Sequence, residues 1–263
     1  MNTIETEIGT ISLDCVQDPP DERDYLFSDD EHNALPIRLD HRNDVVRIMN
    51  QSPEAACVGH AVCAAAEFLF QRKCHLAYDF SQRFLYRKTR ENDQWPGENY
   101  EGTSTRDGLK TWKKLGICEE RYWPWIPYDV RFGSSHFQLV SHEDATFSED
   151  AMTNALQFRI SSYEKCLTTL DIKKALALHG VLVARSEIHT GWKIYGTDSI
   201  RWDESCQELG GHAYVIVGYD DERSSFVVLN SWGTKWGNQG FASLQYNDFW
   251  SNGGTAWVPI LDE

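Results

Sequence analysis

Two distant stretches of the sequence hold residue types that could carry out nucleophilic chemistry. In the first, residues 51–66, the alanines favour a helix that begins near residue 56, which would place Cys57 at its start. There the helix dipole and the unpaired backbone N–H groups favour the thiolate, which is the nucleophilic form, over the thiol. Gln51 is long enough to bring an amide donor to the same place. The pair predicts a nucleophile beside one half of an oxyanion hole.

The second stretch supplies a base and a residue that could orient it. His212 follows two glycines and opens an expected strand, 212–219, so we expect its ring at a sheet edge, facing a cleft. Asn230 ends the next expected strand, 225–229, and could accept the ring N–H and fix its tautomer. Each residue taken alone is more often structural, and a free Cys is usually a small buried hydrophobe. Together they indicate Cys-His-Asn chemistry.

A mixture of helices and strands must position these residues. Apolar periodicity and caps predict helices at 56–72, 81–90, 104–115 and 171–179, and strands at 181–186, 212–219, 225–229 and 240–244. Because helices dominate the first half and strands the second, we predict an α+β fold of two lobes. The predicted domains are an N-terminal arm (1–35), a helical lobe with the nucleophile (36–130) and a β-rich lobe with His212 and Asn230 (131–263).

The N-terminal arm is polar and acidic, and Tyr25, Leu26 and Phe27 could anchor it to the body. It is short and has no long amphipathic pattern. We therefore expect a docked arm rather than a removable inhibitor, so that its deletion should lower stability without raising activity.

Composition excludes several classes of partner. The chain has 25 Lys and Arg against 40 Asp and Glu, a formal charge of −15, which argues against nucleic acid or an anionic membrane as partner. It contains no apolar run of the length that spans a bilayer. The first residues do not resemble a signal peptide, and the seven cysteines are scattered, so we expect reduced thiols and a cytoplasmic location. Nothing in the sequence predicts an oligomeric state.

No cofactor or metal is predicted. Cys57, His60 and Cys63 are spaced by three, but on a helix they would fan out, and structural zinc requires four converging ligands. His60 is better explained as a packed helix residue.

The two stretches, with Asp-Gly-Leu-Lys-Thr-Trp-Lys-Lys-Leu-Gly at 107–116 and Tyr-Trp-Pro-Trp at 122–125, resemble the papain-like cysteine peptidases, in particular their bacterial branch. The resemblance implies a two-lobe fold, with a helical lobe and a β-barrel-like lobe, and an active site in the cleft between them. It implies that Cys57 is the nucleophile, His212 the general acid and base, and Asn230 the orienting residue. Gln51 and the Cys57 backbone N–H would form the oxyanion hole.

The resemblance also implies residues that would bind a peptide or protein substrate. They are Gly102, on the strand that would pair with substrate backbone, and its neighbour Thr103; Gly210 and Gly211 before the catalytic His; Trp232, which would cover the His–Asn pair; and Arg185. Strand alternation puts Arg185 on one face with Val181 and Val183, so it could enter the selectivity pocket and favour Glu or Asp. The alternative is a solvated charge at the strand edge.

Departures from the family pattern leave other functions open. Val58 stands where the secreted enzymes have an aromatic residue, and the family's nearby disulfide cannot form. The same triad could transfer an acyl group to an amine or deamidate a side chain, and a peptidase fold could hold a peptide without cutting it.

Overall fold

The structure is a computed structural model that describes residues 3–7, 9–29, 34–52, 54–93, 101–124 and 148–262. Its helices are α1 (Cys57–Cys74), α2 (Gln82–Asn92), α3 (Thr105–Leu115), α4 (Glu149–Ala155), α5 (Thr169–His179) and α6 (Tyr246–Ser251). Its strands are β1 (Thr3–Thr6), β2 (Gly9–Ser12), β3 (Arg38–Asp40), β4 (Ser162–Cys166), β5 (Leu182–His189), β6 (Glu208–Asp220), β7 (Ser225–Leu229), β8 (Phe241–Gln245) and β9 (Thr255–Ile260). The predicted lobe boundary near residue 130 lies outside the described residues.

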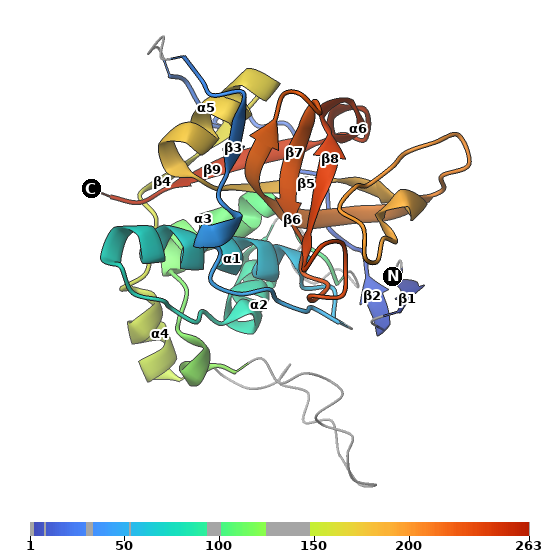
Figure 1. Ribbon diagram of the computed structural model, residues 1–263. Helices are drawn as coiled ribbons and strands as arrows, with labels where there is room; N and C mark the ends of the chain where they lie inside the picture. The colour runs from blue at the N-terminus through green and yellow to red at the C-terminus, as the bar shows by residue number, and fades with distance from the viewer. Residues whose placement is uncertain are drawn as a thin grey trace, which may run out of the picture.

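One large antiparallel sheet forms the upper lobe in Figure 1, and helices α1, α2 and α3 form the lower one. The strand order is β4-β9-β5-β6-β7-β8, and β3 pairs with the end of β6. The two N-terminal strands form a separate hairpin. The α+β prediction is confirmed.

Helix α1 lies in the core between the lobes. Its apolar side chains pack with Val183 of β5 and Val215 of β6 on one face of the sheet, and α5, α6 and the β1–β2 hairpin contribute to the core on the other face. Two glycines allow the helices to approach closely: a Cβ at Gly59 would lie 2.6 Å from a carbonyl of α2, and one at Gly108 would lie 2.7 Å from Val58. Close packing therefore fixes the position of the α1 N-terminus.

The four predicted helices and four predicted strands are all present, with boundaries that differ by at most four residues; β7 matches its predicted bounds at both ends. Strands β1, β2, β3 and β4 and helices α4 and α6 were not predicted, because they are short and their apolar pattern is weak. Strand β9, an apolar segment of six residues, was also missed. Two of the missed elements cross the predicted division between the lobes. Strand β3, from the predicted helical lobe, belongs to the large sheet, and α4, from the predicted β-rich lobe, packs with Phe84 of the helical lobe.

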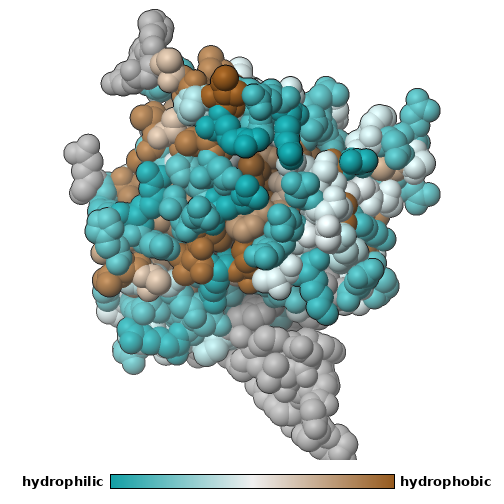
Figure 2. All heavy atoms as spheres, in the orientation of Figure 1, coloured by the Kyte–Doolittle hydropathy of each residue, from teal (hydrophilic) through white to brown (hydrophobic). Residues whose placement is uncertain are grey.

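Most side chains on the face in Figure 2 are hydrophilic, with hydrophobic groups gathered along its left side and centre. No helix among the described residues is long and apolar enough to cross a membrane. All seven cysteines lie in the described part of the chain and are free thiols. Cys74 is exposed, Cys206 is half-buried and the other five are buried.

Candidate active site

Cys57 is the first residue of α1, as predicted, and follows the N-cap Ala56. The first backbone N–H groups of a helix have no partner within the helix, so they and the dipole favour negative charge at this end. The Cys57 side chain is fully buried. It therefore depends on a few specific contacts to hold a charge.

His212 does not open its strand, as the sequence suggested, but is the fifth residue of β6, opposite Ser186 of β5. The prediction of an edge position was wrong because β6 begins earlier, at Glu208, and is a central strand. The pairing of β7 with β6 covers only Val215–Asp220. Beside His212, that flank of β6 is therefore left to the loop that follows β7, which carries Asn230.

Asn230 comes directly after β7 and holds the imidazole. Its Oδ1 lies 2.8 Å from Nε2 of His212 and also accepts the Ser231 backbone N–H at 2.8 Å. These contacts make Oδ1 the acceptor and assign the proton to Nε2. Nδ1 of the same ring is buried and has no nitrogen or oxygen partner in the described part of the chain. The ring lies close enough to the Cys57 sulfur to lower its pKa, and Nδ1, which Asn230 leaves free, is the atom that can exchange a proton with Cys57.

Aromatic rings enclose the His–Asn pair. Trp232 is fully buried, and its ring centroid lies 5.0 Å from that of His212. Trp192 meets the imidazole edge to face at 6.1 Å and stacks with Trp236. The shielding role predicted for Trp232 fits this arrangement. Trp192 was missed, because the Thr190–Trp192 turn carries no signal in the sequence.

Gln51 is held at the site by the residue that follows Asn230. Its Oε1 accepts the Ser231 hydroxyl at 2.7 Å, and its backbone N–H donates to the Ser231 carbonyl at 2.8 Å. With Oε1 occupied, Nε2 is directed to two carbonyls, those of Ser12 at 3.3 Å and Glu54 at 3.2 Å. The predicted oxyanion donor is thus occupied by the carbonyl of an arm residue.

The local contacts strongly favour a thiolate at Cys57. A hydrogen bond from Cys15 lowers the pKa of Cys57; burial raises it, and the hydrogen bond and charge of His212 lower it further, with a net shift well below the usual range. For Cys15 the direction is opposite: burial and the neighbouring Cys57 raise the pKa of its thiol. Cys15 therefore stays a thiol beside a Cys57 thiolate, and its Sγ also lies 3.8 Å from the Val16 carbonyl oxygen.

The arm therefore runs through the site itself. The Cys15 N–H donates to the Gly211 carbonyl at 3.1 Å, and the Val16 N–H donates to the Thr103 carbonyl at 3.1 Å. These two carbonyls belong to the β-rich lobe and the helical lobe, respectively. A Cβ at Gly211 would lie 2.0 Å from the Cys15 carbonyl oxygen, so glycine is needed for the arm backbone to approach. The docked arm was expected, but its place between the lobes was not.

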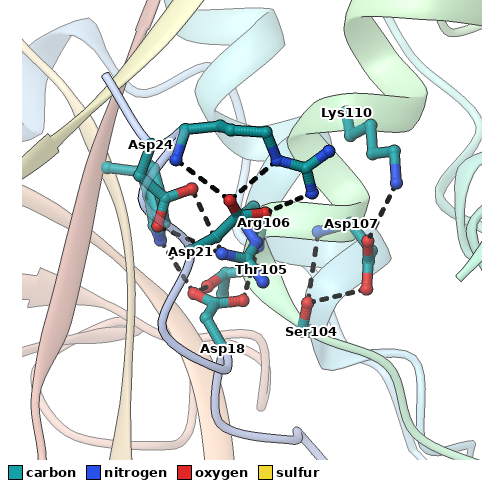
Figure 3. A network of polar contacts seen from close by, with 10 residues as sticks. Asp18, Asp21, Asp24, Ser104, Thr105, Arg106, Asp107 and Lys110 are labelled. Carbon is teal, nitrogen blue, oxygen red and sulfur yellow. Dashed lines mark hydrogen bonds and ion pairs between the residues drawn. The ribbon is translucent and has the colours of Figure 1, made fainter. Parts of the chain in front are cut away.

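Carboxylates of the arm tie it to the start of α3 (Figure 3). Asp18 is 5% exposed and accepts the Thr105 hydroxyl at 2.9 Å, the Arg106 backbone N–H at 3.0 Å and the Trp257 indole N–H at 2.9 Å. The Arg106 guanidinium pairs with Asp24 at 3.0 Å. A carboxylate is favoured at a helix N-terminus for the reasons given for Cys57.

The predicted hydrophobic anchor is mainly Phe27. Its side chain is buried in the core, whereas Tyr25 and Leu26 are 72% and 53% exposed. Their backbones pair with β4: the Lys165 N–H donates to Tyr25 and the Phe27 N–H donates to the Lys165 carbonyl.

Arg185 shares the face of β5 that carries Val183, as strand alternation predicted. The alternative of a solvated edge charge is wrong, because Arg185 is 2% exposed. Its Nη2 donates to the Cys15 carbonyl at 3.3 Å and pairs with Glu187, two residues along on the same face. Nε and Nη1 have no partner among the described residues. A buried guanidinium thus faces the place where the arm lies.

The remaining predicted binding residues lie close to this path. Gly102 and Thr103 are buried next to the arm. Gly210 has φ +139°, which favours glycine, and pairs with Ile188 next to an irregularity in the β5–β6 register. The structure brings these residues to the arm, and their contacts with substrate stay a prediction.

His60 and Cys63 point to structural roles. The His60 Nδ1 hydrogen-bonds the Ala56 carbonyl of its own helix at 2.8 Å, and burial lowers the pKa of His60 to about 4. Cys63 is fully buried, and burial raises the pKa of its thiol. Within the described ranges, no three His, Cys, Asp or Glu side chains converge as metal ligands would.

Comparison with known proteins decides the family. Residues 35–255 match the family described as papain family cysteine protease. The chain belongs to this family. An uncharacterized peptidase C1-like protein of Acanthamoeba polyphaga mimivirus is 26% identical over 94% of this chain and 88% of its own length. Mouse cathepsin K is 23% identical over 85% of this chain, which spans 64% of cathepsin K.

Solved structures agree with this assignment. Xylellain, a cysteine protease from Xylella fastidiosa, is similar with a TM-score of 0.81 and 25% identity, over 95% of this chain and 96% of xylellain. A procathepsin B from Trypanosoma congolense shares the fold, with a TM-score of 0.72 at 16% identity over 95% and 87% of the two chains. The fold is papain-like, and this papain-family protein is a peptidase with peptide or protein substrates.

Proposed function

We propose that this peptidase cleaves peptide bonds through a thioester acyl-enzyme on Cys57, with Cys57, His212 and Asn230 as its triad. The observation that carries the proposal is the chain of contacts from Asn230 Oδ1 through the His212 ring to the buried Cys57 sulfur. Each group has the partner that its role requires: an acceptor orients the base, and the base holds the nucleophile.

The chemistry follows from these positions. The Cys57 thiolate attacks the substrate carbonyl, and the oxyanion takes hydrogen bonds from Gln51 Nε2 and the Cys57 backbone N–H. His212, which took the Cys57 proton on Nδ1 when the thiolate formed, gives this proton to the leaving amine, and the acyl group stays in thioester linkage to Cys57. His212 then removes a proton from water, and the resulting hydroxide attacks the thioester to release the acid and restore the thiolate.

We further propose that the docked arm keeps this site inactive. The Ser12 carbonyl is the acceptor for the amide that would stabilise the oxyanion, and Cys15 is buried beside the nucleophile. A substrate backbone needs the carbonyls of Gly211 and Thr103, which the arm now uses. This reverses the expectation that deleting the arm would not raise activity, which rested on its short length and on the absence of a long amphipathic pattern.

Turnover of a peptide library by the wild type and two α1 variants tests the function. Cys57→Ala should abolish hydrolysis, whereas Cys63→Ala, a change of the same kind on the same helix, should keep most of it. Adding a primary amine separates hydrolysis from transfer, since an amide product in place of the acid would favour acyl transfer. Full hydrolysis by Cys57→Ala would refute the proposal.

A further inference from the structure

Cys15 of the arm and Cys57 of the catalytic helix lie in the same buried cluster, at the boundary between the arm and α1. Cys15 is 3% exposed and Cys57 is fully buried, and each thiol is close enough to shift the pKa of the other. The two residues are 42 positions apart in the chain, and backbone hydrogen bonds at Cys15 and Val16 set the position of the arm thiol. The triad chemistry has no use for a second thiol at this point.

We propose that Cys15 and Cys57 form a reversible disulfide that locks the arm in the active site when a peroxide oxidises the protein. The inference rests on the proposed role of Cys57 as a thiolate nucleophile, because the thiolate is also the form that peroxides oxidise. The other buried cysteine of α1, Cys63, has a raised pKa and belongs to the interlobe core, so it is a poor competitor.

The steps balance with the peroxide as the only oxidant. While the arm is docked Cys57 is covered, so a peroxide reaches it when residues 12–16 lift away. The thiolate sulfur attacks one peroxide oxygen, the O–O bond breaks, and Cys57 becomes a sulfenic acid as hydroxide leaves. When the arm returns, the Cys15 sulfur attacks the sulfenic sulfur; the S–O bond breaks, and the hydroxyl group leaves as water with the Cys15 proton.

The disulfide between Cys15 and Cys57 would have two consequences that noncovalent docking of the arm does not have. A covalent link keeps the arm in place whatever the noncovalent docking strength, so a substrate cannot displace it. The disulfide also protects Cys57 from further oxidation to sulfinic acid, which thiols do not reverse. Exchange with a dithiol returns both cysteines to thiols and oxidises the dithiol, and the enzyme regains its docked, reversible state.

The test treats the full chain with hydrogen peroxide at limiting dose and uses two readouts. Trypsin leaves Cys15 in residues 1–23 and Cys57 in residues 48–72, so mass spectrometry should find these two peptides joined and two hydrogens lighter than their sum. Because residues 48–72 also contain Cys63, the experiment is repeated in Cys63→Ala. In parallel, wild-type activity should fall and return with dithiothreitol.

Two variants make the outcome decisive. At a higher peroxide dose, which carries an unprotected sulfenic acid on to the sulfinic acid, Cys15→Ser should lose activity without recovery by dithiothreitol. At the same dose Cys74→Ser, which changes an exposed thiol of α1, should behave as the wild type and recover. Absence of the joined peptides, or equal recovery in Cys15→Ser, would overturn the proposal. The peptide readout does not depend on turnover: joined peptides in a protein that hydrolyses nothing would sustain the lock and refute the proposed mechanism.

Discussion

Replacing Asp18 by Ala should release the arm and activate the enzyme. Asp18 accepts three hydrogen bonds, from Thr105, Arg106 and Trp257, while almost fully buried. Hydrogen bonds to a charged group contribute about 1.5–3 kcal/mol each, and such contacts are not additive, so we expect the docked state to lose roughly 3–5 kcal/mol. At 1.4 kcal/mol per factor of ten, the docking equilibrium shifts by about 10²-fold or more.

Activity should follow the open fraction of the molecules. If that fraction limits the wild type, kcat/KM rises in Asp18→Ala by at least about tenfold and stops rising when all molecules are open. Hydrogen exchange of the Cys15 and Val16 amides, which the arm contacts protect, should accelerate together with kcat/KM. We would measure kcat/KM on a peptide library and amide exchange by mass spectrometry, both at a temperature where circular dichroism shows a folded protein.

A neighbouring carboxylate supplies the matched control. Asp21 lies on the same arm, and its carboxylate bonds Arg23, which is also part of the arm, so Asp21→Ala should leave docking and activity unchanged. Asp18→Asn keeps an acceptor and should give a smaller gain. A folded Asp18→Ala protein with fast exchange at Cys15 and unchanged kcat/KM would refute the inhibitory role of the arm.

Three further predictions concern the site and its surroundings. His212→Ala should lower kcat nearly as much as loss of the thiol, Gln51→Ala about 10²–10³-fold, and Asn230→Ala less than either, whereas equal small effects would contradict the assigned roles. His60 has a pKa of about 4 in the folded protein, against the usual 6.5, so below pH 6.5 the unfolded chain takes up a proton that the folded protein does not. The free energy of unfolding should therefore fall by up to ~3 kcal/mol between pH 6.5 and pH 4. Urea titrations should show that His60→Gln removes this pH dependence. A substrate library should show a preference for Glu or Asp that Arg185→Glu reverses, and an unchanged hydrophobic preference would remove the pocket role.

The local part of the site could be predicted from the sequence, and the long-range part could not. Cys57 at a helix start follows from helix propensity, and the shared face of Val183 and Arg185 follows from strand alternation. The burial of Arg185 could also have been anticipated, because Glu187, two residues along the strand on the same face, offers a carboxylate that pairs with the guanidinium. The cytoplasmic location stays a prediction.

The path of the arm left no signal in its own residues. Residues 12–16 lie where they do because their backbone meets carbonyls at Thr103 and Gly211, which are distant in sequence. Backbone pairing depends little on side-chain type, so no periodicity reveals it. Asp18 looked like one acidic residue among many, and only the α3 N-terminus, close in space, distinguishes it.

Labelling with an epoxysuccinyl inhibitor tests the central claim, that the Cys57 thiolate is the nucleophile, most directly. Asp18→Ala, with its arm released, should take up one inhibitor molecule per chain, on Cys57, and peptide hydrolysis should fall in proportion to the labelled fraction. Combining Asp18→Ala with Cys57→Ala should remove both labelling and hydrolysis. Loss of hydrolysis with the label on a different cysteine, or hydrolysis that survives complete labelling of Cys57, would contradict the account.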